Sequence, residues 1–489
     1  MRLWIGIYLT QPSLDALNPL WLDEAAAPLA VLDHDTVVAV TPAASRLGVR
    51  PGMRKKGAGA LAPATAFVQR DALRERQLLD AAALAMLQYT PEVAFGPDAS
   101  LLLEVGASLR AFGGPVALCR RLRGTLRQLG CHAHLGMAPT AHGAWLLAAR
   151  PAPGPRRVLR LAPMMRRVSK LPCALLPAAR PYQDWLDGIG CRTLAALLGL
   201  PRPGLQRRCG PALIQALDQV RGQAPELFDW VQAPLEFSAR IELLARIEHS
   251  HAILAVARRL VQQLAGWLGA AQAAVSSIVL VLEHERGRHA RPPTRLAIAL
   301  ADPGWQPEHL LRLLKEHLDR LVLEAPAIAV GLQAGAIVSR ATPSATLFTE
   351  PGGTPQDHAR LLELLVARLG PDRVLAPCPH PDHRPEAANR WLPILDRGQR
   401  AESAGDFAAE RPLWLLQQPI ALVMRHHRPY YGTPLRLLHG PERIENGWWD
   451  GIPVLRDYFV AESEDKIRYW IYLDHALDEP RWYLHGLYA

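Results

Sequence analysis

Two kinds of hydrophobic pattern alternate along the first 150 residues. Short apolar, β-branched runs predict buried strands, whereas stretches with an Ala/Leu face at helical spacing predict helices. The predicted strands are residues 3–9, 30–33, 36–40, 100–105 and 132–136. The predicted helices are residues 71–89, 116–129 and 140–149. This mixture predicts an α+β domain. It is followed by a basic connector, residues 151–168, in which prolines and arginines are interleaved.

The middle of the chain changes character twice. Residues 171–230 have the pattern of a compact helical segment, with two helices joined by the Gly-x-Gly hairpin at Gly188 and Gly190. Residues 235–340 then repeat one pattern of strand, helix and strand. The predicted elements are a strand at 235–243, a helix at 251–268, strands at 275–284 and 294–300, a helix at 307–323 and a strand at 327–338. This order predicts a split βαβ fold, which hosts many functions.

The tail has a third pattern. Residues 357–369 predict a short amphipathic helix, and residues 371–410 a linker rich in Pro, Arg and Asp. From residue 411 onward, alternating polar and apolar positions with turns at 445–451 predict a small antiparallel β module, rich in aromatic residues. The chain of 489 residues is therefore expected to be a multidomain α+β protein.

The charge is distributed unevenly along the chain. The formal net charge is +9, and 50 of the 55 cationic residues are Arg. Residues 151–230 hold 12 Lys/Arg against 5 Asp/Glu, whereas residues 341–489 hold 16 against 20. An Arg-rich segment suits phosphate binding, although a high Arg content can equally reflect genome composition. This difference in charge between residues 151–230 and 341–489 predicts a body that contacts DNA and a tail that contacts proteins.

Several classes of protein are not expected. No apolar run reaches the ~20 residues that span a bilayer, and the first nine residues are too short for a signal peptide. Six Cys residues without a C-x-x-C pair are typical of a reduced, cytoplasmic protein. Cys378, His380 and His383 lack a second ligand pair, so a surface loop is favoured over a zinc site. We expect no metal and no cofactor.

The glycine hairpin is the clearest candidate for nucleic-acid binding. Two glycines let the backbone approach a phosphate, and the N–H groups that start the following helix can then bind it. The alternative is an ordinary turn between two helices, capped by glycine. The positive charge of the segment favours sequence-independent binding of a DNA backbone. The candidate DNA-binding residues are Gly188, Gly190, Arg192, Thr193, Arg207 and Arg208.

The order of these domains resembles the Y-family translesion DNA polymerases. Residues 45–53 are similar to the fingers signature of that family, and residues 135–140 to its G-I-A-x-N segment. The resemblance implies palm and fingers at 1–168, a helix-hairpin-helix thumb at 169–232 and a little finger at 233–340. Beyond it lie a clamp-binding-like peptide, helix and linker at 341–410 and a docking module at 411–489. Residues 440–451 and 482–489 resemble the polymerase-like proteins of bacterial damage-inducible mutagenesis cassettes, which act in the SOS response.

The resemblance also locates an altered catalytic centre. Family members hold two Mg²⁺ ions with an Asp on the first strand and an Asp-Glu pair in a later segment. Those positions fall on Gly6, Ala99 and Ser100, none of which can bind the metals as a carboxylate does. The nearby Asp15, Asp98 and Glu104 are out of register, and we expect them to face solvent or form salt bridges. The contacts to triphosphate and sugar also lack their usual side chains.

The tail contains candidate partner-binding residues. Thr342–Thr349 resembles the Q-x-x-L-F peptides that bind the bacterial sliding clamp, with Ser344 at the Gln position and Leu347-Phe348 as the apolar pair. The alternative is that this pair packs on the preceding sheet. Trp448 and Trp449 beside a turn are candidate docking residues, although aromatic side chains of such a module first form its core. The resemblance implies a RecA-like accessory protein and an error-prone replicative-type polymerase subunit as partners.

The leading hypothesis is a non-catalytic adaptor in translesion synthesis. It would bind primer-template DNA and the clamp, recruit an active polymerase, and be cytoplasmic and associated with the nucleoid. The second hypothesis is a divergent, catalytically active translesion DNA polymerase. The third is a helix-hairpin-helix DNA-binding protein with no role at the replisome. Primer extension separates the first two, and capture of partners by the tail separates the third.

Overall fold

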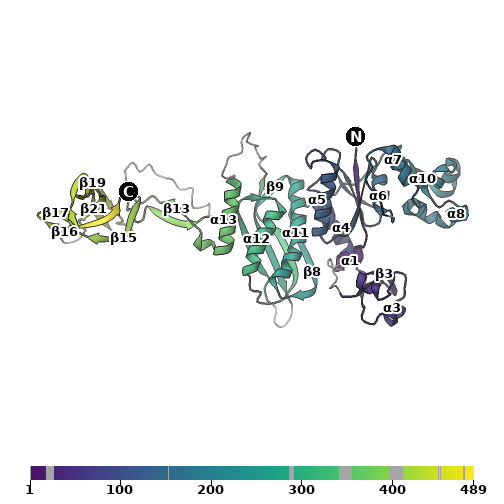
Figure 1. Cartoon of the computed structure of the whole chain (residues 1–489), viewed down its shortest axis with the longest axis horizontal. Coiled ribbons are helices and arrows are strands. Elements are labelled where there is room, and N and C mark those ends of the chain that lie inside the picture. The colour runs from purple at the N-terminus through teal and green to yellow at the C-terminus, as the bar shows by residue number, and fades with distance from the viewer. Residues whose placement is uncertain are drawn as a thin grey trace. The chain divides into compact units, whose positions relative to one another are not determined.

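The computed structural model divides into two compact units, residues 1–359 and 360–489 (Figure 1). Each unit is considered by itself. The residues that the structure describes are 2–17, 27–151, 153–285, 291–340, 355–395, 411–449, 451, 453–476 and 479–488. Within these ranges the fold is mixed α/β, as predicted. None of the helices in these ranges combines the length and hydrophobicity needed to cross a membrane.

The first sheet of unit 1 is antiparallel and has the strand order β5-β6-β1-β7. Its strands are β1 (Trp4–Leu9), β5 (Val93–Gly96), β6 (Ser100–Glu104) and β7 (Ala133–Ala138). Alternate side chains of β1 point to opposite faces. Ile5, Ile7 and Leu9 form one core with α4 (Ala72–Met86) and α5 (Pro115–Gln128). The other face is covered by α6 (Ala141–Ala149), which packs on β1 and β7.

A smaller sheet has the strand order β3-β2-β4. Its strands lie between β1 and β5 in the sequence. Its strands are β2 (Leu29–Asp33), β3 (Thr36–Val40) and β4 (Ala66–Gln69), and the short helices nearby in sequence are α1 (Pro12–Leu17), α2 (Pro42–Arg46) and α3 (Lys55–Leu61). The predicted hairpin at residues 30–40 is confirmed. Strands β4 and β5 were not predicted, because four residues are too few to show a period.

Residues 161–221 form a helical cluster that shares a core with α6. Its elements are α7 (Leu161–Val168), the 3₁₀ helices η1 (Cys173–Leu175) and η2 (Pro177–Tyr182), α8 (Gln183–Gly188), α9 (Leu194–Gly199) and α10 (Arg202–Arg221). The prediction of a connector through residue 168 is wrong for its second half. Met164 and Val168 of α7 are fully buried, so this segment belongs to the helical core.

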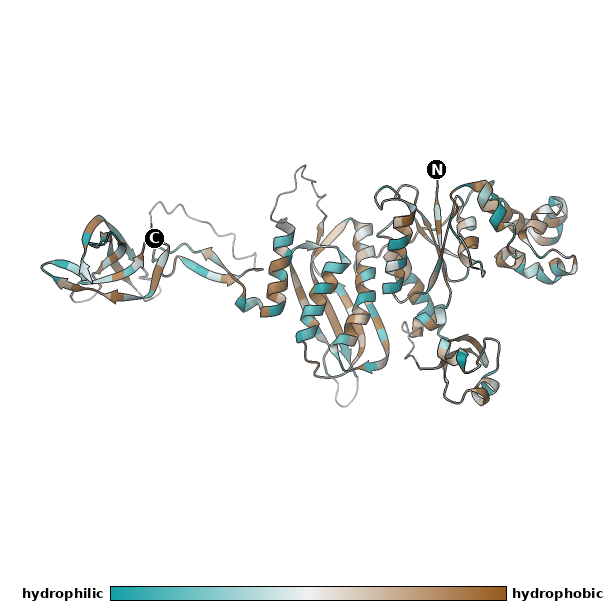
Figure 2. Ribbon diagram, viewed as in Figure 1, coloured by the Kyte–Doolittle hydropathy of each residue, from teal (hydrophilic) through white to brown (hydrophobic). Residues whose placement is uncertain are grey.

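Residues 238–339 adopt the predicted βαββαβ order. The elements are β8 (Ser238–Ile247), α11 (Ser250–Ala271), β9 (Ala273–His284), β10 (Thr294–Gly304), α12 (Pro307–Arg320), β11 (Ala327–Ala334) and the short β12 (Ile337–Ser339). The sheet order β10-β9-β11-β8 is antiparallel throughout, with β12 beside β9. Each βαβ unit therefore has a strand of the other unit between its own two strands. Figure 2 shows hydrophobic residues along these strands and mixed surfaces on the helices.

Helix α11 also packs against α4, so the split βαβ region contacts the first domain. A Cβ at Gly266 would lie 1.9 Å from the carbonyl oxygen of Leu84. A Cβ at Gly269 would lie 2.8 Å from the Cα of Gln88. The two helices therefore meet backbone to backbone, and only glycine fits at this crossing.

In unit 2, residues 371–395 contain regular secondary structure where the sequence predicts a linker. Helix α13 (Pro355–Leu369) agrees with the predicted helix and spans the boundary between the units. It is followed by η3 (Pro371–Arg373) and by a hairpin of β13 (Leu375–Pro379) and β14 (Asn389–Pro393). Prolines hid this hairpin from the sequence pattern, because they are unusual in strands. Residues 396–410 lie outside the described ranges.

The remainder of unit 2 is the predicted antiparallel β module. Five strands have the order β15-β22-β21-β20-β19, and three short strands form a second sheet. They are β15 (Trp414–Ala421), β19 (Arg436–Asn446), β20 (Val454–Glu462), β21 (Arg468–Asp474) and β22 (Arg481–Leu487), and then β16 (Val423–Arg425), β17 (Arg428–Tyr431) and β18 (Thr433–Pro434). Its core is largely aromatic, as predicted.

Candidate functional site

Gly6 is the first position predicted to have lost a metal-binding carboxylate. It lies in the middle of β1, directly beneath α6. A Cβ at residue 6 would lie 2.7 Å from the backbone nitrogen of Trp145 and 2.8 Å from the carbonyl oxygen of Ala144. Gly136, its partner on β7, is equally confined, since its Cβ would lie 2.1 Å from the same oxygen. No side chain fits at residue 6 unless α6 moves.

Ala99 and Ser100 lie at the turn between β5 and β6. Asp98 and Ala99 have φ angles of 52° and 50°, which build this tight turn. Ser100 is buried, and its hydroxyl donates a hydrogen bond to the carbonyl of Pro97. Across the sheet Ser100 faces Tyr8, whereas Gly6 faces Leu102. Gly6 is thus two residues, about 7 Å, along the strand from Ser100, and the three predicted positions do not converge on one point.

Asp98 is the carboxylate next to these positions, and it forms an ion pair. Its two oxygens accept hydrogen bonds from the guanidinium of Arg180 in η2, one of them at 2.8 Å. This contact raises the pKa of Arg180, chiefly through the hydrogen bond. Burial raises the pKa of Tyr8, and the Asp98 charge raises it further while Arg180 opposes this. A guanidinium therefore neutralises Asp98 and ties the helical cluster to the first sheet.

The other two nearby carboxylates have structural partners: Asp15 pairs with a histidine, as expected, whereas Glu104 is buried and binds backbone N–H groups instead of facing solvent or forming a salt bridge. Asp15 is fully buried and accepts hydrogen bonds from the backbone N–H of His132 at 2.8 Å and from its Nδ1 at 2.6 Å. Glu104 lies opposite Trp4 at the far end of the strand pair, where its Oε1 accepts the N–H groups of Leu3 and Gly106. Among the residues that the structure describes, no group of three or more His, Cys, Asp or Glu side chains is placed to hold a metal ion.

The glycine hairpin forms as predicted between α8 and α9. Gly190 has a φ of 75° and open space around it, and Thr193 caps α9. The predicted phosphate donors are nevertheless occupied. The first three N–H groups of α9 donate within the fold, from Leu194 to Leu171 O, from Ala195 to Ser169 O and from Ala196 to Thr193 Oγ1. The start of α9 therefore cannot bind a phosphate, and that part of the prediction is wrong.

The candidate arginines of this region remain on the surface. Arg192, Arg207 and Arg208 are exposed, and Arg208 lies over the ring of Trp185 at 5.7 Å. Arg202, outside the candidate set, is held instead by both oxygens of Asp218 at 2.7 Å. The exposed groups of this region are therefore these arginine side chains and the hairpin at Gly188 and Gly190.

In the tail, Trp448 and Trp449 lie on the turn after β19 and are 78% and 56% exposed. Their rings meet edge to face, with centroids 5.3 Å apart. The aromatic core of the module lies elsewhere, so these two side chains do not serve it. The predicted clamp-binding residues Ser344, Leu347 and Phe348 lie outside the described residues.

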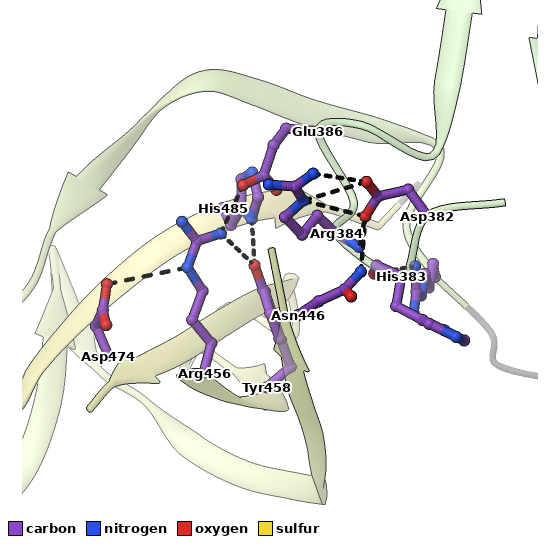
Figure 3. A network of polar contacts seen from close by, with 10 residues as sticks. Asp382, His383, Arg384, Glu386, Asn446, Arg456, Tyr458, Asp474 and His485 are labelled. Carbon is purple, nitrogen blue, oxygen red and sulfur yellow. Dashed lines mark hydrogen bonds and ion pairs between the residues drawn. The ribbon is translucent and has the colours of Figure 1, made fainter. Parts of the chain in front are cut away.

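A buried polar network holds the strand beside this turn (Figure 3). Asp382 accepts hydrogen bonds from Arg384 at 2.8 Å and from Asn446, the last residue of β19, at 2.9 Å. Arg456 contacts Glu386 at 3.0 Å and the hydroxyl of Tyr458 at 3.2 Å. Residues 382–386 are therefore fastened to the β module, and the tryptophan turn projects from a rigid base. Sequence analysis missed this network, because contacts between residues 60 or more positions apart leave no local pattern.

His485 completes the network. Its Nδ1 is 2.8 Å from the hydroxyl of Tyr458, and its ring stacks near Trp470. Burial lowers the pKa of His485 to about 4. Burial also raises the pKa of Tyr458 well above its usual range. Both groups are therefore neutral at pH 7, and a hydrogen bond between the tyrosine hydroxyl and the imidazole Nδ1 joins them.

Comparison with known proteins agrees with these observations. Residues 18–149 match the model of the impB/mucB/samB family. Over 469 residues the chain is 28% identical to Protein ImuB of Caulobacter vibrioides, in strain NA1000 / CB15N and in strain ATCC 19089 / CIP 103742 / CB 15. Each alignment covers 91% of this chain and all of the relative.

Two solved structures are also similar. The ternary complex of Dbh has 15% identity and a TM-score of 0.39, and covers 68% of this chain and 98% of its own. A chimera of the Y-family DNA polymerases Dbh and Dpo4 has 16% identity and a TM-score of 0.37, and covers 69% and 99%. The resemblance to the polymerase-like proteins of mutagenesis cassettes is confirmed by the full-length alignment, and the chain is similar to ImuB over nearly its whole length.

Proposed function

We propose that this protein is a non-catalytic homologue of Y-family polymerases that acts as an adaptor in translesion synthesis. In this proposal the body binds primer-template DNA without sequence preference. The tail and the peptide before it bind the sliding clamp and recruit an error-prone polymerase, which carries out the synthesis during damage-induced mutagenesis.

The observation that carries the proposal is the packing at Gly6. A carboxylate at this position has no space, because the backbone of α6 lies within 2.8 Å of where a Cβ would be. The carboxylate of Asp98 is held by Arg180. Two-metal catalysis needs carboxylates that bridge a pair of ions about 4 Å apart. Gly6 instead packs against the backbone of α6, and Asp98 forms an ion pair with Arg180.

DNA binding is proposed on charge and exposure. Arg192, Arg207 and Arg208 are exposed around the open hairpin, in a segment with seven more cationic than anionic residues. Thr193 caps α9 and so positions the hairpin. Side-chain contacts of this kind bind phosphates without reading bases and weaken as the salt concentration rises.

Partner binding is proposed for the tail. Ser344, Leu347 and Phe348 form the clamp-binding candidate, and the exposed Trp448 and Trp449 are the candidate anchors for a protein partner. By similarity to ImuB, the partners are the RecA-like accessory protein ImuA and the α subunit of an error-prone replicative-type polymerase. Exposed tryptophans on a rigid base are typical anchors of protein interfaces.

Co-purification tests this proposal. The full-length protein should retain the clamp and the polymerase subunit on an affinity column. The double substitution Leu347→Ala/Phe348→Ala should release the clamp alone, and Trp448→Ala/Trp449→Ala should release the polymerase subunit alone. If wild-type protein binds DNA but retains neither partner, the chain is a DNA-binding protein without a role at the replisome, and the adaptor proposal is wrong.

A further inference from the structure

The charge of the tail is divided inside the β module itself. Residues 411–441 contain four Arg and neither Asp nor Glu, whereas residues 442–489 contain ten acidic and five basic residues. The basic part includes β15 and the small sheet β16-β17-β18, and the acidic part begins within β19. A tail that is acidic as a whole therefore carries one strongly basic section.

The small sheet concentrates this basic section on one face. In the hairpin of β16 and β17, Val423 pairs with Tyr430 and Arg425 pairs with Arg428. Residues that pair across strands share a face, as do residues two positions apart on one strand. One face of the hairpin therefore carries all four of these side chains, two arginines next to an aromatic ring and a valine.

On the opposite face of the hairpin, Pro429 and Tyr431 contact the rest of the module, and Met424 is exposed. Pro429 is buried, and its carbonyl accepts a hydrogen bond of 2.9 Å from the N–H of Leu435. The ring of Tyr431 meets Tyr469 of β21 edge to face, with centroids 5.6 Å apart. The face with Arg425 and Arg428 is consequently the outer one, and the contacts of Pro429 and Tyr431 hold the hairpin in place.

The two arginines of the outer face differ from the others in the basic section. Arg411 is paired with Glu442 at 2.7 Å and Arg436 with Glu462 at 3.2 Å. Neither Arg425 nor Arg428 has an ion pair among the described residues. Both are exposed, and the guanidinium of Arg425 lies 4.6 Å from the centroid of the Tyr430 ring.

We propose that the outer face of the β16–β17 hairpin binds single-stranded DNA. Arginines without an acidic partner supply donors for phosphate oxygens. Tyr430 and the guanidinium that lies over it form a flat platform on which an unpaired base can stack. Only a single strand offers both an accessible base face and a backbone. This contact is separate from the DNA contacts proposed for the body of the protein.

Photo-crosslinking of the full-length protein tests the location. Oligothymidylate that carries 5-iodouracil should crosslink to a peptide that contains Tyr430 or Tyr431. In equilibrium titrations, Arg425→Ala/Arg428→Ala should weaken binding and reduce the slope of log K against log salt by about 1.4, since each lost phosphate contact contributes about 0.7 for single strands. Arg390→Ala/Arg481→Ala, which removes two exposed arginines from other strands of the unit, is the matched control and should leave the slope unchanged.

Three results would overturn the proposal. One is a crosslink that maps only to the body of the protein. Another is an equal loss of affinity in the control variant, because the effect would then reflect net charge. The third is a hairpin variant that binds oligothymidylate normally but has lost affinity for a poly-glutamate peptide, which would assign this face to an acidic protein partner. Unchanged thermal unfolding of the variants shows that each comparison concerns folded protein.

Discussion

The centre of the first sheet and the tail module differ in what fills them: backbone and apolar side chains in the first, paired polar side chains in the second. Around Gly6 the space is filled by the backbone of α6 and by apolar side chains, and the nearby carboxylates serve as structural partners. In the tail, ionisable residues lie close together in the interior, and the structure pairs them with one another (Figure 3). Position 6 corresponds to a catalytic carboxylate in the resemblance, whereas nothing in the sequence marks the tail as polar inside.

This difference indicates what each region is built to do. A strand packed against a helix at backbone distance gains rigidity but has no group that could bind metal. A buried network of paired polar groups costs desolvation energy, and in return it fixes one arrangement of distant segments. The first sheet is thus held by close packing, whereas residues 382–386 are held to the tail module by polar contacts.

The largest expected effect comes from placing a carboxylate at position 6. Gly6→Asp should destabilise the protein by about 3 kcal/mol or more, because the new Cβ clashes with the α6 backbone and the carboxylate is buried without a partner. Thermal unfolding measures this. Gly57→Asp, at an exposed helical glycine with open space around it, is the control and should change stability far less. A Gly6→Asp protein as stable as wild type would contradict the packing argument.

Breaking the tail network should have the next largest effect. Asp382→Ala removes the carboxylate that accepts hydrogen bonds from both Arg384 and Asn446. We expect a loss of about 3 kcal/mol in unit 2 and rapid proteolysis between residues 371 and 395. Asp372→Ala, at an exposed position in η3, should leave the cleavage rate unchanged. Equal cleavage of both variants would mean that the network does not fasten this segment.

The tail should also lose stability as the pH falls, because His485 is buried and neutral in the folded module. The pKa of His485 is lowered to about 4 in the folded module, whereas an unfolded histidine titrates near 6.5. As the pH falls through this interval, the unfolded chain gains a proton that the folded module does not, so stability falls by about 2 kcal/mol by pH 4.5. In His485→Gln this part of the loss should vanish. Parallel stability curves of wild type and variant would exclude His485 as the cause.

The smallest effect is expected for the ion pair beside the altered centre. Arg180→Ala should cost about 0.5–1 kcal/mol, because both side chains are more than one third exposed and water screens the pair. The cost should shrink at high salt. Arg246→Ala, which breaks a more exposed pair with Glu285, should cost less still. A larger loss that persists in 1 M salt would show that Arg180 acts through packing instead.

Local pattern predicted most elements but few contacts. The apolar run of β1 and the helical spacing of α4 and α11 depend on neighbouring residues, and the sequence displays them directly. The segment with α7 was misassigned because prolines and arginines hid Met164 and Val168, which complete a core formed mainly by residues far away in sequence. The β13–β14 hairpin was hidden in the same way by its prolines.

The candidate site shows the same limit. Gly6 and the exposed Trp448 could be singled out from sequence, because a missing or unusual side chain is visible there. That Gly6 packs against Ala144, or that Arg180 reaches Asp98, depends on contacts between segments more than 80 residues apart. The occupied donors at the start of α9 are a further example, since their hydrogen bonds to the carbonyl oxygens of residues 169 and 171 have no local signature.

Primer extension on a damaged template tests the central claim most directly. Purified protein, Mg²⁺ and all four deoxynucleotides are incubated with and without the clamp and the partner polymerase. We predict no extension by the protein alone and lesion bypass when all components are present, with bypass lost in the Leu347→Ala/Phe348→Ala variant. Mg²⁺-dependent extension by the protein alone would contradict the account and identify a catalytically active polymerase.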